Sequence, residues 1–230
     1  MPRKTHPAHY LMYDWLAPLY DLGVWFAALP LGGEEGLRAP VLRELEAGRV
    51  TGRERRIDKA RPLEGRKVLE IFAGTGTLSI EAASLGARAI ALDVTAGMLR
   101  VASEKARRAG VVVGFARADA ESLPFPDGSF DGVMVSLGLH ETEGPLVPLI
   151  IKEAARVLRE GGRFVIFDFH RACGGAGFLQ ALFFAFFEGE TARAWVRTDI
   201  QKALMDAGFR DFRRSFLKRG VFQLIAVQKP

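Results

Sequence analysis

The chain has 230 residues, of which 49% are hydrophobic, and a formal net charge of +5. That length and apolar content are enough to bury one substantial core, and they exclude a disordered chain. The single cysteine, Cys173, excludes an intramolecular disulfide, so we expect no dependence on an oxidising compartment and assign this thiol no catalytic role.

The first residues are basic, but Asp14 and Asp21 interrupt the apolar stretch that a signal peptide needs. No uncharged apolar run reaches the ~20 residues that cross a bilayer, the longest candidate being residues 173–187. We therefore expect a cytoplasmic protein that is soluble or peripherally attached to a membrane. Aromatic residues gather between positions 10 and 26, at Tyr10, Tyr13, Trp15, Tyr20, Trp25 and Phe26.

Residues 49–67 are strongly basic, and their net charge of +5 equals the excess of the whole chain. Their basic side chains are Arg49, Arg53, Arg55, Arg56, Lys59, Arg61, Arg66 and Lys67. Such a cluster can contact phosphates, but no aromatic residue interrupts it, which weakens the case for RNA binding. We expect a solvated linker here.

The stretch from Val68 to Ala83 predicts an apolar strand, a glycine turn and an amphipathic helix. Gly74 and Gly76 allow a tight turn and a close approach of the backbone to a ligand. A nicotinamide fingerprint would need a glycine or alanine at Ser79, and Glu70 lies in the strand, where a pyrophosphate would be repelled. S-adenosylmethionine fits better, because its methionine end carries an ammonium group.

Two further strands end in carboxylates. The segment ARAIALDV ends near Asp93, whose oxygens suit the hydroxyls of a ribose, and VVVGFARAD ends near Asp119. Between them we expect a helix that Thr95 caps and Gly110 closes. Alternating strands and helices predict a parallel, doubly wound α/β sheet that binds ligands beyond the carboxyl ends of its strands. The last 21 residues predict two strands joined by a turn at Arg219-Gly220.

With the later segments DAESLPFPDGSFDGVMVSLGLHE and LREGGRFVIFDF, residues 66–168 resemble class I S-adenosylmethionine-dependent methyltransferases. The resemblance is to the group that includes ubiquinone- and menaquinone-biosynthesis enzymes and other small-molecule or lipid methyltransferases. It implies a Rossmann-like seven-stranded sheet of order 3-2-1-4-5-7-6 with the last strand antiparallel. It also implies an N-terminal helical cover on the substrate side (1–48), a basic linker (49–65) and a cofactor-binding domain (66–230).

The resemblance assigns S-adenosylmethionine as cofactor and places its contacts residue by residue. Glu70 and the glycine turn would hold the methionine end, Asp93 the ribose and Asp119 the adenine amine, beside the backbone of Ala120. The expected cofactor-binding set is Glu70, Phe72, Ala73, Gly74, Gly76, Asp93, Val94, Met98, Asp119, Ala120, Ser136 and Leu137.

Phe72 departs from the family pattern, which usually carries glycine at this first position of the turn. Because phenylalanine tolerates a positive φ poorly, we expect an extended backbone at Phe72.

The acceptor is expected to be small and hydrophobic or aromatic, such as a quinone precursor or a lipid amine. This expectation rests on the aromatic segment 10–26 and on the helix predicted for residues 178–187, FLQALFFAFF. Tyr13, Tyr20, His140 and Asp168 are the candidate substrate contacts.

Methyl transfer is an in-line displacement that requires alignment and exclusion of water but no metal. His140 with Glu141, after the fourth strand, is the first candidate for a general base, and His170 is the second.

Two alternatives stay open. Phe72 and the basic cluster favour an RNA methyltransferase. The sequence Ser136-Leu137-Gly138-Leu139-His140 opposes base-amine methylation, because such enzymes carry Asn or Asp followed by Pro-Pro-aromatic there, so we disfavour nucleic acid as a partner. The other alternative is a regulatory protein that binds the cofactor without transferring the methyl group, since the motifs report binding alone.

Overall fold

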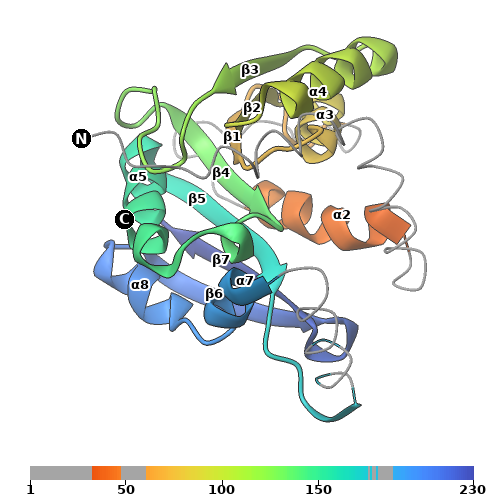
Figure 1. The fold of residues 1–230 in the computed structure, drawn as a ribbon. Helices are drawn as coiled ribbons and strands as arrows, with labels where there is room; N and C mark the ends of the chain where they lie inside the picture. Colours follow the sequence, from red (N-terminus) through yellow and green to blue (C-terminus); the bar gives the residue numbers. More distant parts are fainter. Residues whose placement is uncertain (1–32, 48–60, 176, 178–179, 181–188) are drawn as a thin grey trace.

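The computed structural model describes residues 33–47, 61–175, 177, 180 and 189–230 (Figure 1). Its centre is a seven-stranded sheet of order β3-β2-β1-β4-β5-β7-β6. The strands are β1 (Lys67–Ile71), β2 (Arg88–Asp93), β3 (Val113–Arg117), β4 (Phe130–Ser136), β5 (Leu158–Phe169), β6 (Arg210–Leu217) and β7 (Phe222–Gln228). β1 to β5 pair in parallel, and β7 runs antiparallel to both β5 and β6. The predicted α/β class, strand order and final hairpin are confirmed.

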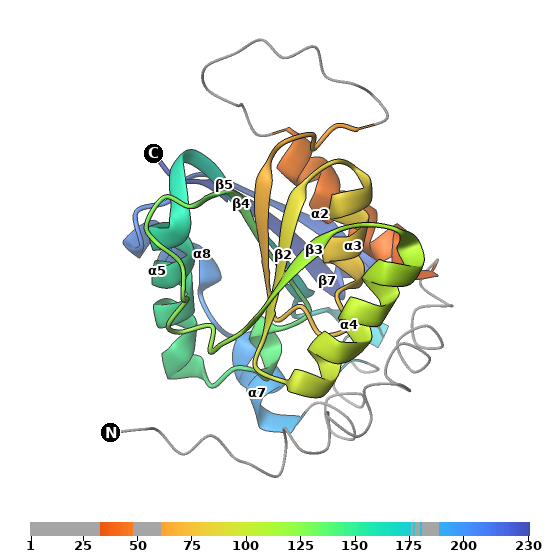
Figure 2. The same cartoon turned by 90° about the horizontal axis from the view of Figure 1, so that it is seen from above.

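Helices cover both faces of this sheet (Figure 2). On one face lie α2 (Gly33–Glu46), α3 (Thr77–Ser84) and α4 (Ala96–Ala109), and on the other α5 (Val147–Val157) and α8 (Ile200–Asp206). The remaining helical elements are α7 (Gly189–Trp195) and the 3₁₀ turns η2 (Leu139–Glu141), η3 (Gly144–Leu146) and η5 (Lys218–Gly220). Within the described residues, no helix has the length and apolar character that a membrane span requires.

The central strands are buried on both faces, which explains their continuous apolar sequences. In β7 only the last residue, Gln228, is not fully buried, and in β1 only the first, Lys67, is exposed. Parallel strands flanked by helices on both sides require this composition. At about 25 cal/mol per Å² of apolar surface, the burial of these side chains is the main stabilising contribution to the fold.

The limits of α4 follow the prediction in part. Gly110 closes the helix in the left-handed conformation, with φ of 68°. Thr95 occupies the predicted N-cap position, but its side chain makes no capping hydrogen bond. Its backbone N–H instead donates to Asp93 Oδ1 at 2.8 Å, so a carboxylate from the preceding strand binds at the start of the helix.

Helix α2, the described part of the 1–48 segment, is fixed to the sheet at its C-terminus. Arg66 donates to the carbonyl oxygens of Leu45 and Glu46, the latter at 2.9 Å, and Arg163 donates to Glu44 O at 2.9 Å. These guanidinium groups satisfy carbonyls that have no partner inside the helix. Gly132 of β4 makes the close packing possible, because a Cβ there would lie 2.7 Å from Leu45 Cδ2.

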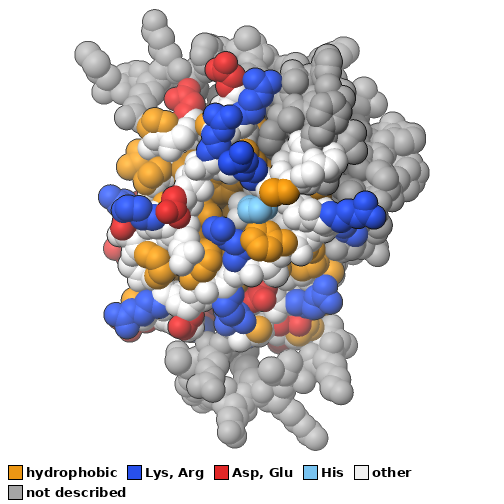
Figure 3. Space-filling model, turned by 90° about the horizontal axis from the view of Figure 1, so that it is seen from below, with side chains coloured by type: hydrophobic (Ala, Val, Ile, Leu, Met, Phe, Trp, Pro, Cys, Tyr) orange, Lys and Arg blue, Asp and Glu red, His pale blue; other side chains and the backbone are white. Residues whose placement is uncertain are grey.

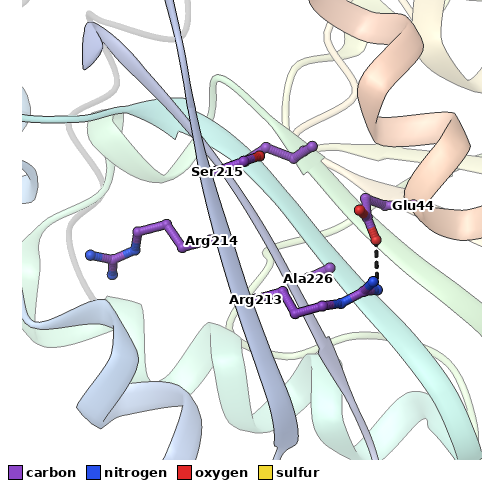
Figure 4. A pocket seen from close by; sticks show the side chains of 6 residues that line it. Glu44, Arg213, Arg214, Ser215 and Ala226 are labelled. Carbon is purple, nitrogen blue, oxygen red and sulfur yellow. Dashed lines mark hydrogen bonds and ion pairs between the residues drawn. The ribbon is translucent and has the colours of Figure 1, made fainter.

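A small pocket lies between α2 and the β6–β7 hairpin (Figure 4). Its lining residues are Glu44, Arg213, Arg214, Ser215, Leu224 and Ala226. Arg213 Nη2 lies 2.7 Å from Glu44 Oε2, so the two charges compensate each other across the pocket, while Arg214 points away from them. None of the described residues predicted to bind cofactor or substrate lines this pocket.

Candidate active site

The candidate site lies at the carboxyl edge of the sheet, as expected for a doubly wound fold. Glu70 is the second-last residue of β1, Asp93 the last of β2 and Ser136 the last of β4. Asp168 is the second-last residue of β5. Because these strands are parallel neighbours, residues far apart in the sequence come together at one edge.

Glu70 links β1 to the helix that follows the glycine turn. Its Oε2 accepts hydrogen bonds from the backbone N–H of Ser79 at 2.8 Å and from Ser79 Oγ at 2.5 Å, which ties β1 to the first turn of α3. Glu70 is only 3% exposed. This burial raises the pKa of its carboxyl to about 7, against the opposing effect of the Ser79 hydrogen bonds.

Asp93 joins two loops. Its Oδ2 accepts from Gly74 N at 2.8 Å, and its Oδ1 accepts from Thr95 N at 2.8 Å. Burial raises the pKa of this carboxyl, and the backbone donors partly offset that effect. Each carboxylate oxygen has a second lone pair, so Asp93 can accept from ligand hydroxyls while it keeps the glycine turn in place.

The glycine turn itself is left-handed at three positions. Gly74 has φ of 52° and Gly76 has φ of 70°. A Cβ at Gly76 would lie 2.8 Å from Ala102 Cβ, so this glycine allows α3 and α4 to pack closely. No described residue lies within 4 Å of an ideal Cβ at Gly74, so the described part of the chain leaves space beside the turn for a ligand.

The third left-handed position is Phe72, with φ of 60°, so the prediction of an extended backbone there was wrong. The conformation is held from both sides. The next N–H, of Ala73, donates to Leu92 O at 3.0 Å, and the Phe72 side chain lies where a side chain at Gly138 would stand, 2.5 Å from an ideal Cβ at that glycine. Leu137, beside Gly138, is also left-handed, with φ of 56°. Such backbone strain persists where packing and hydrogen bonds over-determine it.

The predicted adenine side of the site is only partly enclosed. Met98 and Ala120 are buried at 5% and 8% exposure, and Val94 and Ser136 are half-buried. The side chain of Asp119 is exposed and accessible to a ligand. These residues could contact a purine ring, with apolar side chains against the ring and the Asp119 carboxylate at its amine.

Lys105, which the sequence did not predict as a site residue, binds two threonines next to the glycine turn. Its Nζ donates to Thr75 Oγ1 at 3.1 Å and to Thr77 Oγ1 at 2.6 Å. The contact spans 28 to 30 residues, and a lysine among the other charged residues of α4 gives no sign of it in the sequence.

His140 and Asp168, which the sequence placed separately near the acceptor, contact each other directly. His140 Nδ1 lies 2.8 Å from Asp168 Oδ1, and the side chains are 4% and 0% exposed. Asp168 also accepts from the backbone N–H groups of Phe169 (2.7 Å), Leu139 (2.9 Å) and His140 (3.3 Å). The carboxylate is therefore fully enclosed behind His140.

The other two base candidates differ in position. Glu141 is exposed on the same η2 turn as His140. His170 lies beside the β6–β7 turn, where its Nδ1 lies 3.0 Å from Gly220 O and its backbone N–H donates to Val221 O. The His170 ring thus contacts the β6–β7 turn, whereas the His140 ring contacts Asp168.

Aromatic side chains adjoin this pair. Phe169 lies edge-on to the His140 ring, with centroids 4.8 Å apart. Trp195 of α7 is 3% exposed and donates from Nε1 to Phe169 O at 2.8 Å. Trp195 was not predicted, because its contact with β5 depends on how α7 folds back beside η2. Tyr13, Tyr20 and the rest of segment 10–26 lie outside the described residues, as do most of residues 178–187.

A mixed sheet of this order, with a glycine turn after β1 and carboxylates at the ends of β1 and β2, defines the Rossmann-like methyltransferase class. Comparison with known proteins agrees. The model of a family described as "Methyltransferase domain" matches residues 68–162. An uncharacterized methyltransferase of Synechocystis sp. is 32% identical over 214 residues, which cover 93% of this chain and 91% of that protein.

The demethylmenaquinone methyltransferase of Paenarthrobacter aurescens is 34% identical over 185 residues, covering 72% of this chain and 71% of that protein. Other demethylmenaquinone and ubiquinone/menaquinone methyltransferases match over 42% to 59% of their own length. A solved S-adenosylmethionine-dependent methyltransferase from Thermotoga maritima shares the fold, with a TM-score of 0.62 and 22% identity over 96% of this chain and 99% of that one.

The chain belongs to the S-adenosylmethionine-dependent methyltransferases, in the group with the ubiquinone and menaquinone enzymes. It is an enzyme, and S-adenosylmethionine is the cofactor of this family. The residues at the carboxyl edge fit that cofactor: the described residues leave space beside Gly74, and Asp93 and Asp119 offer acceptor oxygens. None of the relatives named here is described as an RNA methyltransferase or a non-catalytic protein.

Proposed function

We propose that this methyltransferase acts on a small hydrophobic or aromatic acceptor of the quinone-precursor or lipid-amine type. The observation that carries the proposal is the buried His140–Asp168 pair, enclosed by Phe169 and Trp195 next to the cofactor turn. Two aromatic side chains beside one oriented polar group favour an acceptor that buries an aromatic or aliphatic body and presents one reactive atom. The similarity to a demethylmenaquinone methyltransferase over most of the chain supports the same class of acceptor.

Different residues at the edge of the sheet would contact different parts of the cofactor. Glu70 and the turn through Gly74 and Gly76 would lie at the methionine end, Asp93 at the ribose, and Asp119 with Ala120 and Met98 at the adenine. Phe72, Ala73, Val94, Ser136 and Leu137 would complete the contact surface. When bound, the cofactor supplies an electrophilic methyl group on a sulfonium.

His140 would serve as the general base. Nδ1–H of His140 would donate its hydrogen bond to Asp168, which would hold the imidazole as the tautomer whose Nε2 carries the lone pair. That nitrogen would take a proton from a hydroxyl, amine or activated carbon as the methyl group is transferred. Phe72 packs at Gly138, two residues before His140, so the same contact would set the base relative to the cofactor turn. Asp168 would act through His140, as a positioning residue.

Glu141 and His170 have weaker claims. Glu141 is exposed on the same turn as His140 and would act from the solvent side of the site. His170 is engaged with the β6–β7 turn, so it would serve as base only for an acceptor bound at that end of the site. Tyr13 and Tyr20 remain proposed acceptor contacts.

The proposal is tested by methyl transfer from labelled S-adenosylmethionine to three sets of acceptors: demethylated quinone precursors, lipid amines and small hydrophilic amines or phenols. We expect turnover with a hydrophobic set. His140→Asn should lower kcat by about 10²-fold or more and leave cofactor affinity within about twofold, since a positioned base contributes about 10²–10⁴. Methylation of hydrophilic acceptors alone would refute the acceptor class, and an unchanged kcat in His140→Asn would remove the base role.

A further inference from the structure

The turn between β6 and β7 lies at the active-site edge of the sheet, at the lower right of Figure 1. It is joined to the end of β5 by two hydrogen-bonding contacts: His170 N donates to Val221 O at 2.8 Å, and His170 Nδ1 lies 3.0 Å from Gly220 O. The turn is therefore held in a defined position beside the end of the strand that carries Asp168.

The end of β6, next to this turn, exposes an aromatic side chain. Phe216 is 55% exposed, whereas Phe115, the other exposed aromatic residue in the described part of the chain, is 36% exposed. The His170 ring lies against Phe216, with centroids 4.5 Å apart and planes tilted by 48°. A single exposed hydrophobic residue is common on protein surfaces, so its surroundings decide what it means.

Three cationic residues lie near Phe216 along the chain or next to its contact residue, His170. Arg171, Lys218 and Arg219 are all exposed, and their side chains make no hydrogen bond or ion pair within the described residues. Lys218 and Arg219 hold left-handed conformations, with φ of 50° and 59°, ahead of Gly220 at 83°. Figure 3 shows the lower face of the molecule, where Lys and Arg side chains lie around hydrophobic side chains and a histidine.

We propose that this hairpin tip, defined by Arg171, Phe216, Lys218 and Arg219, docks on the surface of an anionic lipid bilayer. Phe216 would insert at the boundary of headgroups and acyl chains, and the cations would lie over anionic headgroups. Charge complementarity favours this occupant, because Arg171, Lys218 and Arg219, which form no ion pair within the described residues, adjoin His170 and Phe216 in the sequence. A base-stacking surface would need an open ring, but His170 lies against the Phe216 ring.

This inference goes beyond the proposed acceptor. Docking through the tip would turn the carboxyl edge of the sheet, with His140 behind it, toward the bilayer. A lipophilic molecule could then pass between membrane and site without crossing bulk water, but the docking itself does not depend on which acceptor is methylated.

The test is co-sedimentation of the full chain with vesicles of phosphatidylcholine alone or of phosphatidylcholine mixed with phosphatidylglycerol. We expect binding to the mixed vesicles that falls as salt rises, with little binding to phosphatidylcholine alone. Lys218→Glu with Arg219→Glu should weaken binding by at least about tenfold, since each cation near an anionic surface contributes about a factor of five. Phe216→Ser should weaken it further.

A matched control reverses the same number of charges elsewhere. Arg88→Glu with Lys152→Glu alters two exposed cations on β2 and α5 and should leave vesicle binding within about twofold. Circular dichroism and cofactor titration check that each variant is folded. Equal binding by the tip variant and the control variant would overturn the proposal. The proposal would also be overturned if the protein bound no vesicles but bound an RNA oligonucleotide, and the tip variant lost that RNA binding. No acceptor is used, so failure here leaves the proposed acceptor class untouched.

Discussion

At the scale of single residues, the His140–Asp168 contact is the feature with the most chemical consequence. Asp168 is fully buried and accepts from three backbone N–H groups as well as from His140. These donors give both oxygens of the buried side chain a hydrogen-bond partner, and an unsatisfied polar group there would be costly. The same enclosure prevents the carboxylate from reaching a substrate directly.

Replacing Asp168 with Asn keeps the shape of the side chain but removes its charge, so it no longer selects the tautomer of His140. We expect kcat to fall by about 10²–10⁴. Cofactor affinity should change little, and unfolding should become easier by about 1–3 kcal/mol. Steady-state kinetics over a range of pH separates the two roles: a positioning residue alters the pH profile of kcat, whereas a purely structural one lowers stability alone. Glu143→Gln, on the exposed surface nearby, is the control and should leave both unchanged.

Glu70 makes the stability of the cofactor-free protein depend on pH. Burial raises its folded pKa to about 7 from an ordinary value of 4.5, so between those values the folded state binds more protons than the unfolded state. Stability therefore falls as pH rises from about 4.5 to 7, by up to about 3 kcal/mol, and levels off above that range. Glu70→Gln, which has no proton to lose, should flatten this dependence. Urea unfolding at several pH values measures it, and an identical slope in both proteins would contradict the assignment.

At the scale of secondary-structure elements, the ends of β1 and β4 are coupled through one contact. Phe72 occupies the space that a side chain at Gly138 would need. Gly138→Ala should therefore push the cofactor turn and destabilise the fold by about 1–3 kcal/mol. Phe72→Gly removes the clashing atoms, so the double variant should be destabilised by less than the sum of the two single changes. Thermal unfolding and cofactor titration of the four proteins test this, and strict additivity would show that the contact does not couple the strands.

The elements were predictable from sequence where local pattern and topology decide, and not where long-range packing does. Glycines at 74 and 76, a carboxylate at the end of β2 and alternating strands and helices were enough to predict a doubly wound sheet and its binding edge. The strand order came from the family resemblance. The backbone at Phe72 was predicted wrongly, because its φ depends on Gly138, a residue 66 positions later that leaves room for its ring. The Lys105 and Trp195 contacts depend on how helices return to the sheet, which residue types alone do not encode.

At the scale of the whole molecule, the cofactor edge is assembled from β1, β2, β4 and β5, and Asp93 connects two of its loops. Because a ligand that binds only the folded state stabilises it by mass action, S-adenosylmethionine at 100 times its Kd should raise the free energy of unfolding by about 2.7 kcal/mol.

Asp93→Ala removes the acceptor for Gly74 N and for the expected ribose hydroxyls together. We expect calorimetric titration to detect micromolar binding of S-adenosylmethionine and S-adenosylhomocysteine in the unaltered protein and none in this variant. The ligand-dependent rise in Tm should disappear with it. Glu104→Ala, an exposed change on α4, should keep both responses. If Asp93→Ala still bound the cofactor with unchanged affinity, the ribose would have to lie elsewhere on the edge. The roles of Gly74 and Asp119 would then need a different ligand orientation, because all three assignments assume one pose across the ends of β1, β2 and β3.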